Sequence, residues 1–572
     1  MTIVISDSQY KSALTQTNFL PEQSGVCTNC GRPVPPQFIS CPECGLFQPH
    51  APYPTNLPAY FQERQVSVKA LKQSGLPSAE TTYLALGGGL GSFAWADYLR
   101  ICGAAANQIT VVGTDPVPYA RFRRLCLASQ ILDAERIRSD SSARPDNVWG
   151  WPGYALQEIV ELMGQKKLLA AARIAWQIFG EPTMAHTYAP TAQTVYTAVD
   201  REMKRIGWRQ MVQTGEICAV RQTDDGRYVV VFLPSAVRTP RQTQRRATRF
   251  IIAPYLHLAL GYPGVCLTPE AQSYRRTYHD IRRVVQGYET HEHIYEQLQQ
   301  SGGTVILRGR GVVASRILQH LDEIRQMSGQ PIQVIHLLRS PVTEKTAYGQ
   351  ASRLLHHHRQ VQPFNWPKAT FGGELRNVME KATPEERREL AALWGGTTTS
   401  DRPDWLEVVE RGQKEGWYSF AFGTVAEIKP NGRNRLILKL QNDKTAAAGG
   451  RLVADFMFDC TGLNTDSSSN PILGDLACRY GIEQNGAGGW LVSPDFEVKG
   501  LRNGGGQVFA AGITAAGNAF APVDSFLGLQ YAAQRAVNTL IQEKAPNLHL
   551  LTPLESLEQW WRWVNGREPS TV

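Results

Sequence analysis

The chain has 572 residues, of which 42% are hydrophobic and 19% charged, and its net charge is +8. This composition is ordinary for a globular protein of three or four domains that needs no disulfide staples, and the charge is too mild to indicate a nucleic-acid partner. No signal peptide and no stretch of roughly 20 apolar residues is visible, since the longest apolar run, residues 250–260, contains Pro254 and His257; we therefore expect a cytoplasmic protein without a transmembrane segment.

Two closely spaced cysteine pairs follow a polar tail that we place at residues 1–24. Each pair is a CxxC sequence followed by glycine, in which both sulfurs reach one ion and the glycine permits a tight turn. Four thiolates at this spacing favour tetrahedral Zn²⁺ in a structural role. We predict a zinc ribbon at 25–46, with an iron site of the rubredoxin kind or a dithiol redox pair as alternatives. The predicted metal ligands are Cys27, Cys30, Cys41 and Cys44.

A proline-rich linker is expected at 47–78, and a first dinucleotide-binding pattern comes after it. A buried strand at 82–86, a glycine cluster, an apolar helix and a strand at 109–113 form a βαβ unit. The glycines permit the turn and let the backbone approach a pyrophosphate, a small residue allows helix–strand packing, and a later acid holds ribose hydroxyls. A strand-to-helix turn without a ligand is the alternative. The residues in these roles are Gly87, Gly89, Gly91, Ser92 and Asp115.

Strand patterns continue at 216–222, 228–232 and 250–254, after helical residues 155–180. The densest basic stretch, residues 238–249, lies between the last two strands. We interpret it as a solvated hairpin loop, although a polyanion or an acidic protein could also bind it.

A second dinucleotide-binding pattern begins at residue 304. A strand runs into Gly-x-Gly-x-x-small and a helix, and the next strand, 332–338, ends in arginine where the first unit has an acid. Arginine pairs with a 2′-phosphate that a carboxylate would repel, so the pattern favours NADPH over NADH; a surface arginine is the alternative. The candidate residues are Gly309, Arg310, Gly311, Ala314, Ser315 and Arg339.

The rest of the chain reads as a mostly helical polar stretch at 354–417, strands at 424–430, 435–441 and 453–460, a strand at 507–512 and a long final helix. Trp560, Trp561 and Trp563 follow near the C-terminus. Packing against the main body is the simpler interpretation for these tryptophans, and docking on a partner or membrane is the alternative.

This order of patterns resembles the flavoproteins with two dinucleotide-binding domains, which include flavin-containing and N-hydroxylating monooxygenases. The resemblance covers about residues 80–545 and implies FAD at the first glycine pattern and NADPH at the second. It implies an α/β fold of two Rossmann-like three-layer domains, the NADPH domain (266–463) inserted between the two parts of the FAD domain (79–265 and 464–545). The zinc ribbon and a C-terminal tail, 546–572, flank them.

The same resemblance assigns further residues. Gly462 ends a strand where the family has Ala-Thr-Gly, and Gly512 stands where the family has Gly-Asp, so the usual acid is missing and Asp524 is expected to substitute. Ser525 would cap the last helix, whose positive end faces the flavin. His291 matches part of a monooxygenase motif between Val285 and Tyr295, which makes it the catalytic candidate; a helix start with surface histidines is the alternative.

The predicted function is therefore an FAD-dependent oxidoreductase that takes hydride from NADPH. Its acceptor would be O₂ with a small-molecule substrate, as in a monooxygenase, or a quinone or protein, as in a reductase. The alternative is a redox-sensing scaffold that docks on a larger complex, as its protein partner, through the zinc ribbon.

Overall fold

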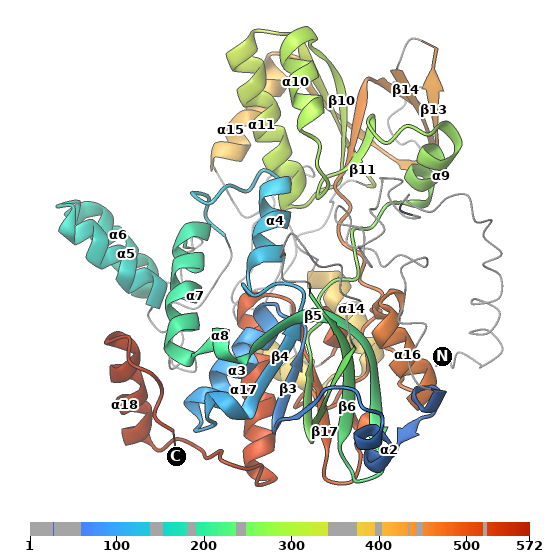
Figure 1. The fold of residues 1–572 in the computed structure, drawn as a ribbon. Helices are drawn as coiled ribbons and strands as arrows, with labels where there is room; N and C mark the ends of the chain where they lie inside the picture. The colour runs from blue at the N-terminus through green and yellow to red at the C-terminus, as the bar shows by residue number, and fades with distance from the viewer. Residues whose placement is uncertain are drawn as a thin grey trace, which may run out of the picture.

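The computed structural model describes residues 27, 59–137, 153–179, 190–235, 248–340, 374–394, 403–432, 435–441, 450–518 and 523–571. These residues form an α/β fold with two large, mainly parallel sheets, one below the other in Figure 1. The predicted α/β class is confirmed at this level. Of the predicted zinc ligands, Cys30, Cys41 and Cys44 lie outside the described residues, as does most of the basic stretch 238–249.

The first sheet has nine strands in the order β17-β8-β3-β4-β5-β6-β7-β2, with β1 paired to β5. The pairs from β17 to β5 are parallel, whereas β5, β6 and β7 form an antiparallel meander. The strands are β1 (Gln65–Val66), β2 (Ser78–Glu80), β3 (Tyr83–Leu86), β4 (Ile109–Gly113), β5 (Val212–Thr223), β6 (Tyr228–Pro234), β7 (Arg249–Ala253), β8 (Tyr255–Leu258) and β17 (Gln507–Ala510).

The second sheet has five parallel strands in the order β12-β11-β10-β16-β9. They are β9 (Val284–Gln286), β10 (Gly303–Arg308), β11 (Ile332–Leu338), β12 (Tyr418–Phe422) and β16 (Phe456–Asp459). All of them come between β8 and β17 in the sequence, so the chain leaves the first sheet once and returns to it once. A smaller antiparallel sheet contains β13 (Thr424–Asn431), β14 (Arg435–Gln441) and β15 (Arg451–Ala454).

Helices cover both faces of the first sheet, because alternate residues of a strand point to opposite sides. Tyr83 and Ala85 pack with α3, α7 and α17, whereas Leu84 and Leu86 pack with α16. The helices of the described chain are α2 (Val68–Gln73), α3 (Leu90–Ile101), α4 (Ala120–Ala128), α5 (Gly153–Gly164), α6 (Leu168–Phe179), α7 (Ala192–Ile206), α8 (Trp208–Met211), α9 (Pro269–Tyr278), α10 (Glu292–Ser301), α11 (Val312–Ser328), α13 (Glu374–Lys381), α14 (Pro384–Trp394), α15 (Pro403–Lys414), α16 (Pro471–Tyr480), α17 (Phe526–Gln542) and α18 (Pro553–Val564).

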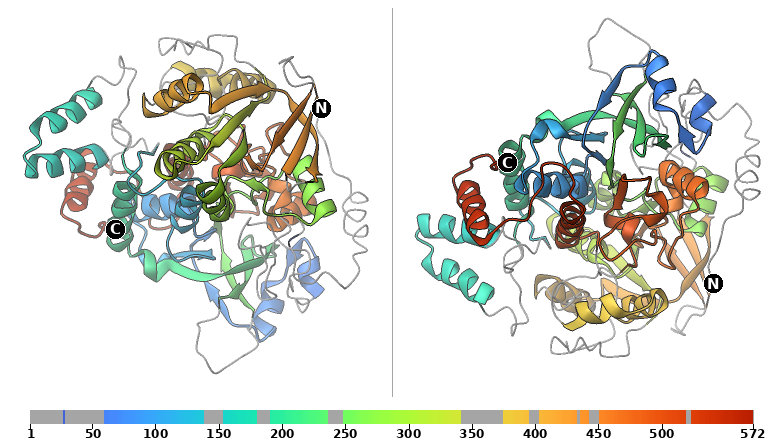
Figure 2. Two further views of the ribbon diagram at one scale, coloured as in Figure 1. Left: turned by 90° about the horizontal axis from the view of Figure 1, so that it is seen from above. Right: turned by 90° about the horizontal axis from the view of Figure 1, so that it is seen from below.

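The second sheet differs from the three-layer expectation on one face. Val305 and Leu307 of β10 pack against α10, α11 and α15, as expected. Ile306, on the opposite face, shares a cluster with α9 and with Leu436 and Leu438 of the small antiparallel sheet. One side of this sheet is therefore covered partly by another sheet, and the two views of Figure 2 show that small sheet at the edge of the molecule.

The predicted strand 250–254 is confirmed as β7, but the sequence pattern missed β8, which follows Pro254 in the same apolar run. The predicted strand 453–460 is two strands in different sheets, since β15 is antiparallel to β14 and β16 is parallel to β10. Among the described helices, none is both long and apolar enough to cross a bilayer.

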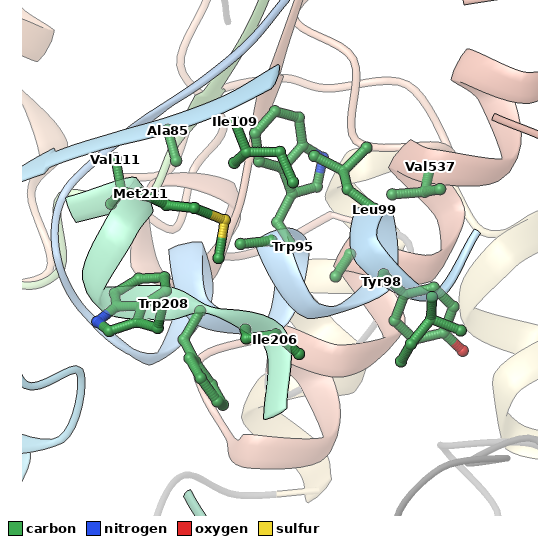
Figure 3. Packing of buried hydrophobic residues seen from close by; sticks show 14 of the residues in the cluster. Ala85, Trp95, Tyr98, Leu99, Ile109, Val111, Ile206, Trp208, Met211 and Val537 are labelled. Atoms are coloured by element: carbon green, nitrogen blue, oxygen red, sulfur yellow. The ribbon is translucent and has the colours of Figure 1, made fainter. Parts of the chain in front are cut away.

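The largest hydrophobic core lies between the first sheet and its helices α3, α7 and α17 (Figure 3). Trp95 of α3 and Trp208 are fully buried in this core. The Trp95 ring stacks on His257 of β8, with ring centroids 4.9 Å apart and an angle of 8° between the planes. Burial lowers the pKa of His257 to about 3, so this imidazole is part of the core as a neutral aromatic ring.

Neutral His257 should make the fold sensitive to acid. Its folded-state pKa lies below the ordinary value of about 6.5, so stability is complete above that pH and is lost as the pH falls toward 3, at about 1.4 kcal/mol per pH unit. We predict that His257→Phe flattens the pH dependence of the urea unfolding midpoint between roughly pH 6.5 and 4.5. The control His279→Asn, at an exposed site in the left-handed region, should unfold like the wild type. An unchanged slope in His257→Phe would contradict the prediction.

Candidate functional site

The first glycine turn connects β3 to α3, and Gly87 makes it sterically possible. Its φ is +105°, and an added Cβ would lie 2.2 Å from the backbone oxygen of Ala259. Its N–H donates to the Val112 oxygen at 2.8 Å. The turn thus packs against the residue that follows β8 and is hydrogen-bonded to β4, so only glycine fits at position 87.

The other side of this turn is open at Gly89. Gly89 precedes the first residue of α3, and an added Cβ there would meet no atom within 4 Å. Gly91, in contrast, faces the Ala259 Cβ at 3.0 Å, and Ser92 is fully buried. The predicted residues therefore divide: Gly87, Gly91 and Ser92 pack the turn, and Gly89 leaves its backbone accessible to a ligand.

Asp115 lies beside this turn, as its spacing predicts. An added Cβ on Gly88 would be 2.7 Å from the Asp115 backbone oxygen, so the loop after β4 packs on the glycines. Arg121 of α4 is its electrostatic neighbour: burial and nearby Arg124 lower the pKa of Arg121, and Asp115 opposes them. The Arg121 guanidinium also donates to the Tyr262 backbone oxygen at 2.6 Å.

The second glycine turn repeats the geometry of the first. Gly309 follows β10 with φ +125°, and an added Cβ would lie 2.6 Å from the Cys460 backbone oxygen. Its N–H donates to the Leu337 oxygen at 3.2 Å. Gly311 precedes α11, where Ala314 and Ser315 are buried and the Ser315 hydroxyl donates to the Val312 oxygen at 2.8 Å.

The His336 side chain is hydrogen-bonded to this second turn, a role that the sequence pattern did not indicate. Its Nε2 lies 2.5 Å from the Gly309 oxygen, and its Nδ1 lies 2.8 Å from the Tyr418 hydroxyl. Burial lowers the pKa of His336 to about 4, so the neutral ring donates from Nε2 and accepts at Nδ1. The only sequence signal was a histidine inside the apolar strand IQVIHLL.

Two guanidinium groups lie at the ends of β10 and β11. Arg310 donates to the Ser340 backbone oxygen, and burial followed by the nearby charge of Arg339 lowers the pKa of Arg310. Arg339 is exposed directly after β11. Neither arginine forms an ion pair with any residue that the structure describes, so two adjacent cations are available to an anion.

Helix α4 lies between the two large sheets (Figure 1). Burial raises the pKa of the Tyr288 phenol, and the ionisable groups near it are the Cys126 and Cys460 thiols and the Asp524 carboxylate. Cys460 abuts the second turn and Asp524 precedes α17, which packs on α3. The Tyr262 hydroxyl donates to the Asp524 carboxylate, and burial raises the pKa of Tyr262. One group of ionisable side chains therefore lies near residues that pack on each of the two turns.

The residues assigned through the family resemblance occupy the same region. Ser525 caps α17 by accepting from the Gly528 N–H at 3.0 Å. Gly512, with φ +63°, follows β17, and an added Cβ would lie 3.4 Å from Leu529. Gly462 has φ +117°, and its oxygen accepts from the Gln286 side chain at 2.7 Å, at the crossing between the two sheets.

His291 does not reach this region. Its ring is fully buried, with the Phe458 ring centroid 4.9 Å away and the Tyr295 centroid 5.3 Å away, both edge-on. A side chain enclosed in the core of the second sheet cannot touch a substrate, so we do not carry His291 forward as a catalytic residue. The motif match misled because it gives no information about burial.

The predicted zinc site is represented only by Cys27, which is buried against Val265 and Leu267. The remaining ligands lie outside the described residues. Within the described part of the chain, no cluster of His, Cys, Asp and Glu could hold a metal ion.

Solved structures share this fold, whereas no family model and no curated protein matches the sequence. The ornithine hydroxylase PvdA from Pseudomonas aeruginosa is 13% identical, with a TM-score of 0.55 over 81% of this chain and 100% of its own. The Kutzneria sp. 744 ornithine N-hydroxylase KtzI, with reduced FAD, NADP⁺ and L-ornithine, is 15% identical, with the same TM-score and coverage. The cadaverine monooxygenase DfoA from Erwinia amylovora, bound to FAD, is 13% identical, with a TM-score of 0.54 over 86% of this chain and 95% of its own.

The two glycines of the first turn should respond differently to alanine. We predict that Gly87→Ala lowers the free energy of unfolding by about 2–4 kcal/mol, because it forces a positive φ and a backbone clash. Gly89→Ala, which meets open space, should change it by less than about 1 kcal/mol. Urea unfolding of both variants tests this, and equal losses would show that the turn is not built as described.

Proposed function

We propose that this chain is an FAD-dependent oxidoreductase that takes hydride from NADPH and uses O₂ to oxidise a small molecule. The observation that carries the proposal is the pair of equivalent glycine turns, each of which follows a parallel strand and opens a helix. Such turns bind diphosphates through bare backbone N–H groups and a helix N-terminus. When bound, FAD would accept hydride from NADPH and pass the electrons to O₂.

The first turn fits FAD. An added Cβ on Gly89 would meet no atom within 4 Å, so a diphosphate could approach the backbone there, and Asp115, whose backbone packs on Gly88, would accept from ribose hydroxyls. Arg121 would bring a positive charge to the same edge. Gly512 and Gly462 would let the backbone pass close to the flavin, and Asp524 would replace the missing acid of the family.

The second turn fits NADPH. Gly309 and Gly311 would present the backbone to the diphosphate while Ala314 and Ser315 pack α11 against it. Arg310 and Arg339 would pair with the 2′-phosphate, because two guanidiniums without a described acidic partner favour a dianion. The bond from His336 would keep the turn in place.

The choice of O₂ and a small-molecule substrate is supported by the neighbours, whose names are hydroxylase and monooxygenase and whose substrates are ornithine and cadaverine. The competing possibility is a redox-sensing scaffold, which the absence of an acid at Gly512–Ile513 favours.

We also propose a structural zinc ribbon at Cys27, Cys30, Cys41 and Cys44, which the sequence spacing supports. Cys27 packs on the cluster formed by α9 and the second sheet. A ribbon there would be anchored to the body of the enzyme.

The colour and redox behaviour of the purified protein test the proposed function. We expect a yellow protein that NADPH bleaches without air and that air reoxidises, with zinc and no iron by metal analysis. Gly89→Ala should stay folded but lose the colour, since its methyl group enters the diphosphate space. A colourless wild type that does not bind added FAD would support the scaffold instead.

The arginine pair predicts the choice of nucleotide. Because a hydrogen bond to a charged group contributes about 1.5–3 kcal/mol, Arg339→Ala should raise the KM for NADPH roughly ten- to hundredfold and leave that for NADH nearly unchanged. Steady-state flavin reduction with both nucleotides measures the difference. Arg451→Ala, an exposed arginine on β15, is the control. Equal losses for both nucleotides would refute the assignment.

A further inference from the structure

Three helices on one side of the molecule carry most of the large hydrophobic residues that are exposed in the described part of the chain. Of the 17 exposed large hydrophobic residues in the described part of the chain, six lie on the α5–α6 hairpin and four on α18. We call this surface the helical flank. Its members are Leu156, Val160, Met163, Leu168, Leu169, Trp176, Leu554, Leu557, Trp561 and Val564. Contiguous apolar patches of this kind mark interaction sites.

The spacing of these residues is that of helix-packing seams. On α18 the exposed residues follow one another at intervals of three, four and three, from Leu554 to Val564. On α5 the intervals are four and three, and on α6 Leu169 and Trp176 are seven apart. Heptad spacing places such side chains in one stripe that packs against another helix. The stripes therefore fit helical partners.

The hairpin does not need these residues for its own packing. Ala155 and Ile174 form the buried contact between α5 and α6, with Ile159 and Leu162 packed around them. The exposed stripe is a second apolar face, on which Leu169 is 89% exposed. The hairpin stands out from the body of the molecule (Figure 1), so both of its helices remain accessible.

The hairpin and α18 both contact the same helix, α7. Arg201 of α7 donates to the backbone oxygens of Trp563 and Val564 at 2.6 and 2.7 Å, and its guanidinium lies over the Trp563 ring. α5 also contacts α7. The views of Figures 1 and 2 agree that hairpin and α18 lie on one side.

Charges of opposite sign flank the two stripes. Basic residues outnumber acidic ones on the hairpin, since its turn carries the exposed Lys166 and Lys167 and α6 adds Arg173. In comparison, α5 has the exposed Glu161 as well as Glu158, which pairs with Arg136. On α18, Glu555 and Glu558 lie beside the apolar stripe, and Glu558 also pairs with Arg562 at 2.8 Å. An anionic lipid surface would be attracted by the hairpin and repelled by α18, whereas a protein surface with an excess of basic residues on one helix pair and of acidic residues on another helix is complementary to itself.

We propose that the helical flank binds a second copy of this chain, the hairpin of one protomer lying against α18 of its partner. In a dimer with two-fold symmetry this contact forms twice, because the hairpin of each protomer lies against α18 of the other. Stable interfaces bury about 800 Å² on each partner, which ten large exposed side chains can supply. This proposal does not depend on the proposed enzymatic function.

Sedimentation velocity of the full chain across a wide concentration range tests the proposal. The wild type should sediment as a dimer, and Leu169→Glu combined with Leu557→Glu should raise the dimer dissociation constant at least about a hundredfold. Met327→Glu, on α11 at a site that is 80% exposed, is the matched control and should remain dimeric. Circular dichroism checks that each variant is folded.

Cysteine pairing tests the arrangement itself. When Leu169→Cys and Leu557→Cys proteins are mixed under oxidising conditions, we expect a disulfide-linked heterodimer, while neither variant alone should form a linked dimer efficiently. Three results would overturn the proposal: a monomeric wild type, a dimer unaffected by the glutamate substitutions, or cross-linking of Leu169→Cys only to itself. Co-sedimentation of monomeric protein with phosphatidylglycerol vesicles would assign the flank to lipid instead.

Discussion

The arrangement of the site depends on the absence of a Cβ atom at two glycines. Gly87 follows β3, in the parallel part of the first sheet, and Gly309 follows β10, the middle strand of the second. An added Cβ on either glycine would clash with the backbone oxygen of a residue that follows the neighbouring strand. Each also donates to the strand on its other side, through Val112 and Leu337 respectively. Both turns therefore require glycine for the same reason, because a turn this tight between three strand ends leaves no room for a side chain.

The equivalence of the turns makes their differences informative. After β4 the first turn has Asp115, whereas after β11 the second has Arg339, with Arg310 nearby. Under the proposed function, an acid and a pair of cations at equivalent positions would favour different nucleotides, one with free ribose hydroxyls and one with an added phosphate. Tyr288, which follows β9 of the second sheet, has Cys460, whose backbone abuts the second turn, and Asp524, which precedes α17, as ionisable neighbours.

Two buried histidines, one in each large sheet, have different structural roles. His257 and His336 are both neutral and buried, but only His336 has a bond to a glycine turn. His257 fills space beside Trp95, a role that an aromatic ring of similar shape can take over. The same residue type therefore stabilises the core in one sheet and positions the candidate site in the other.

The sequence by itself determined the local units: both strand–glycine–helix turns, the residues that end β4 and β11, and the order in which the sheets are used. These features depend on the sterics and periodicity of residues adjacent in the chain. Only the tertiary structure decided that His291 is enclosed by Phe458 and Tyr295, that His336 supports Gly309, that 453–460 divides between two sheets, and that Tyr288 neighbours Asp524. Those outcomes depend on contacts between residues far apart in the chain, which a local pattern does not encode.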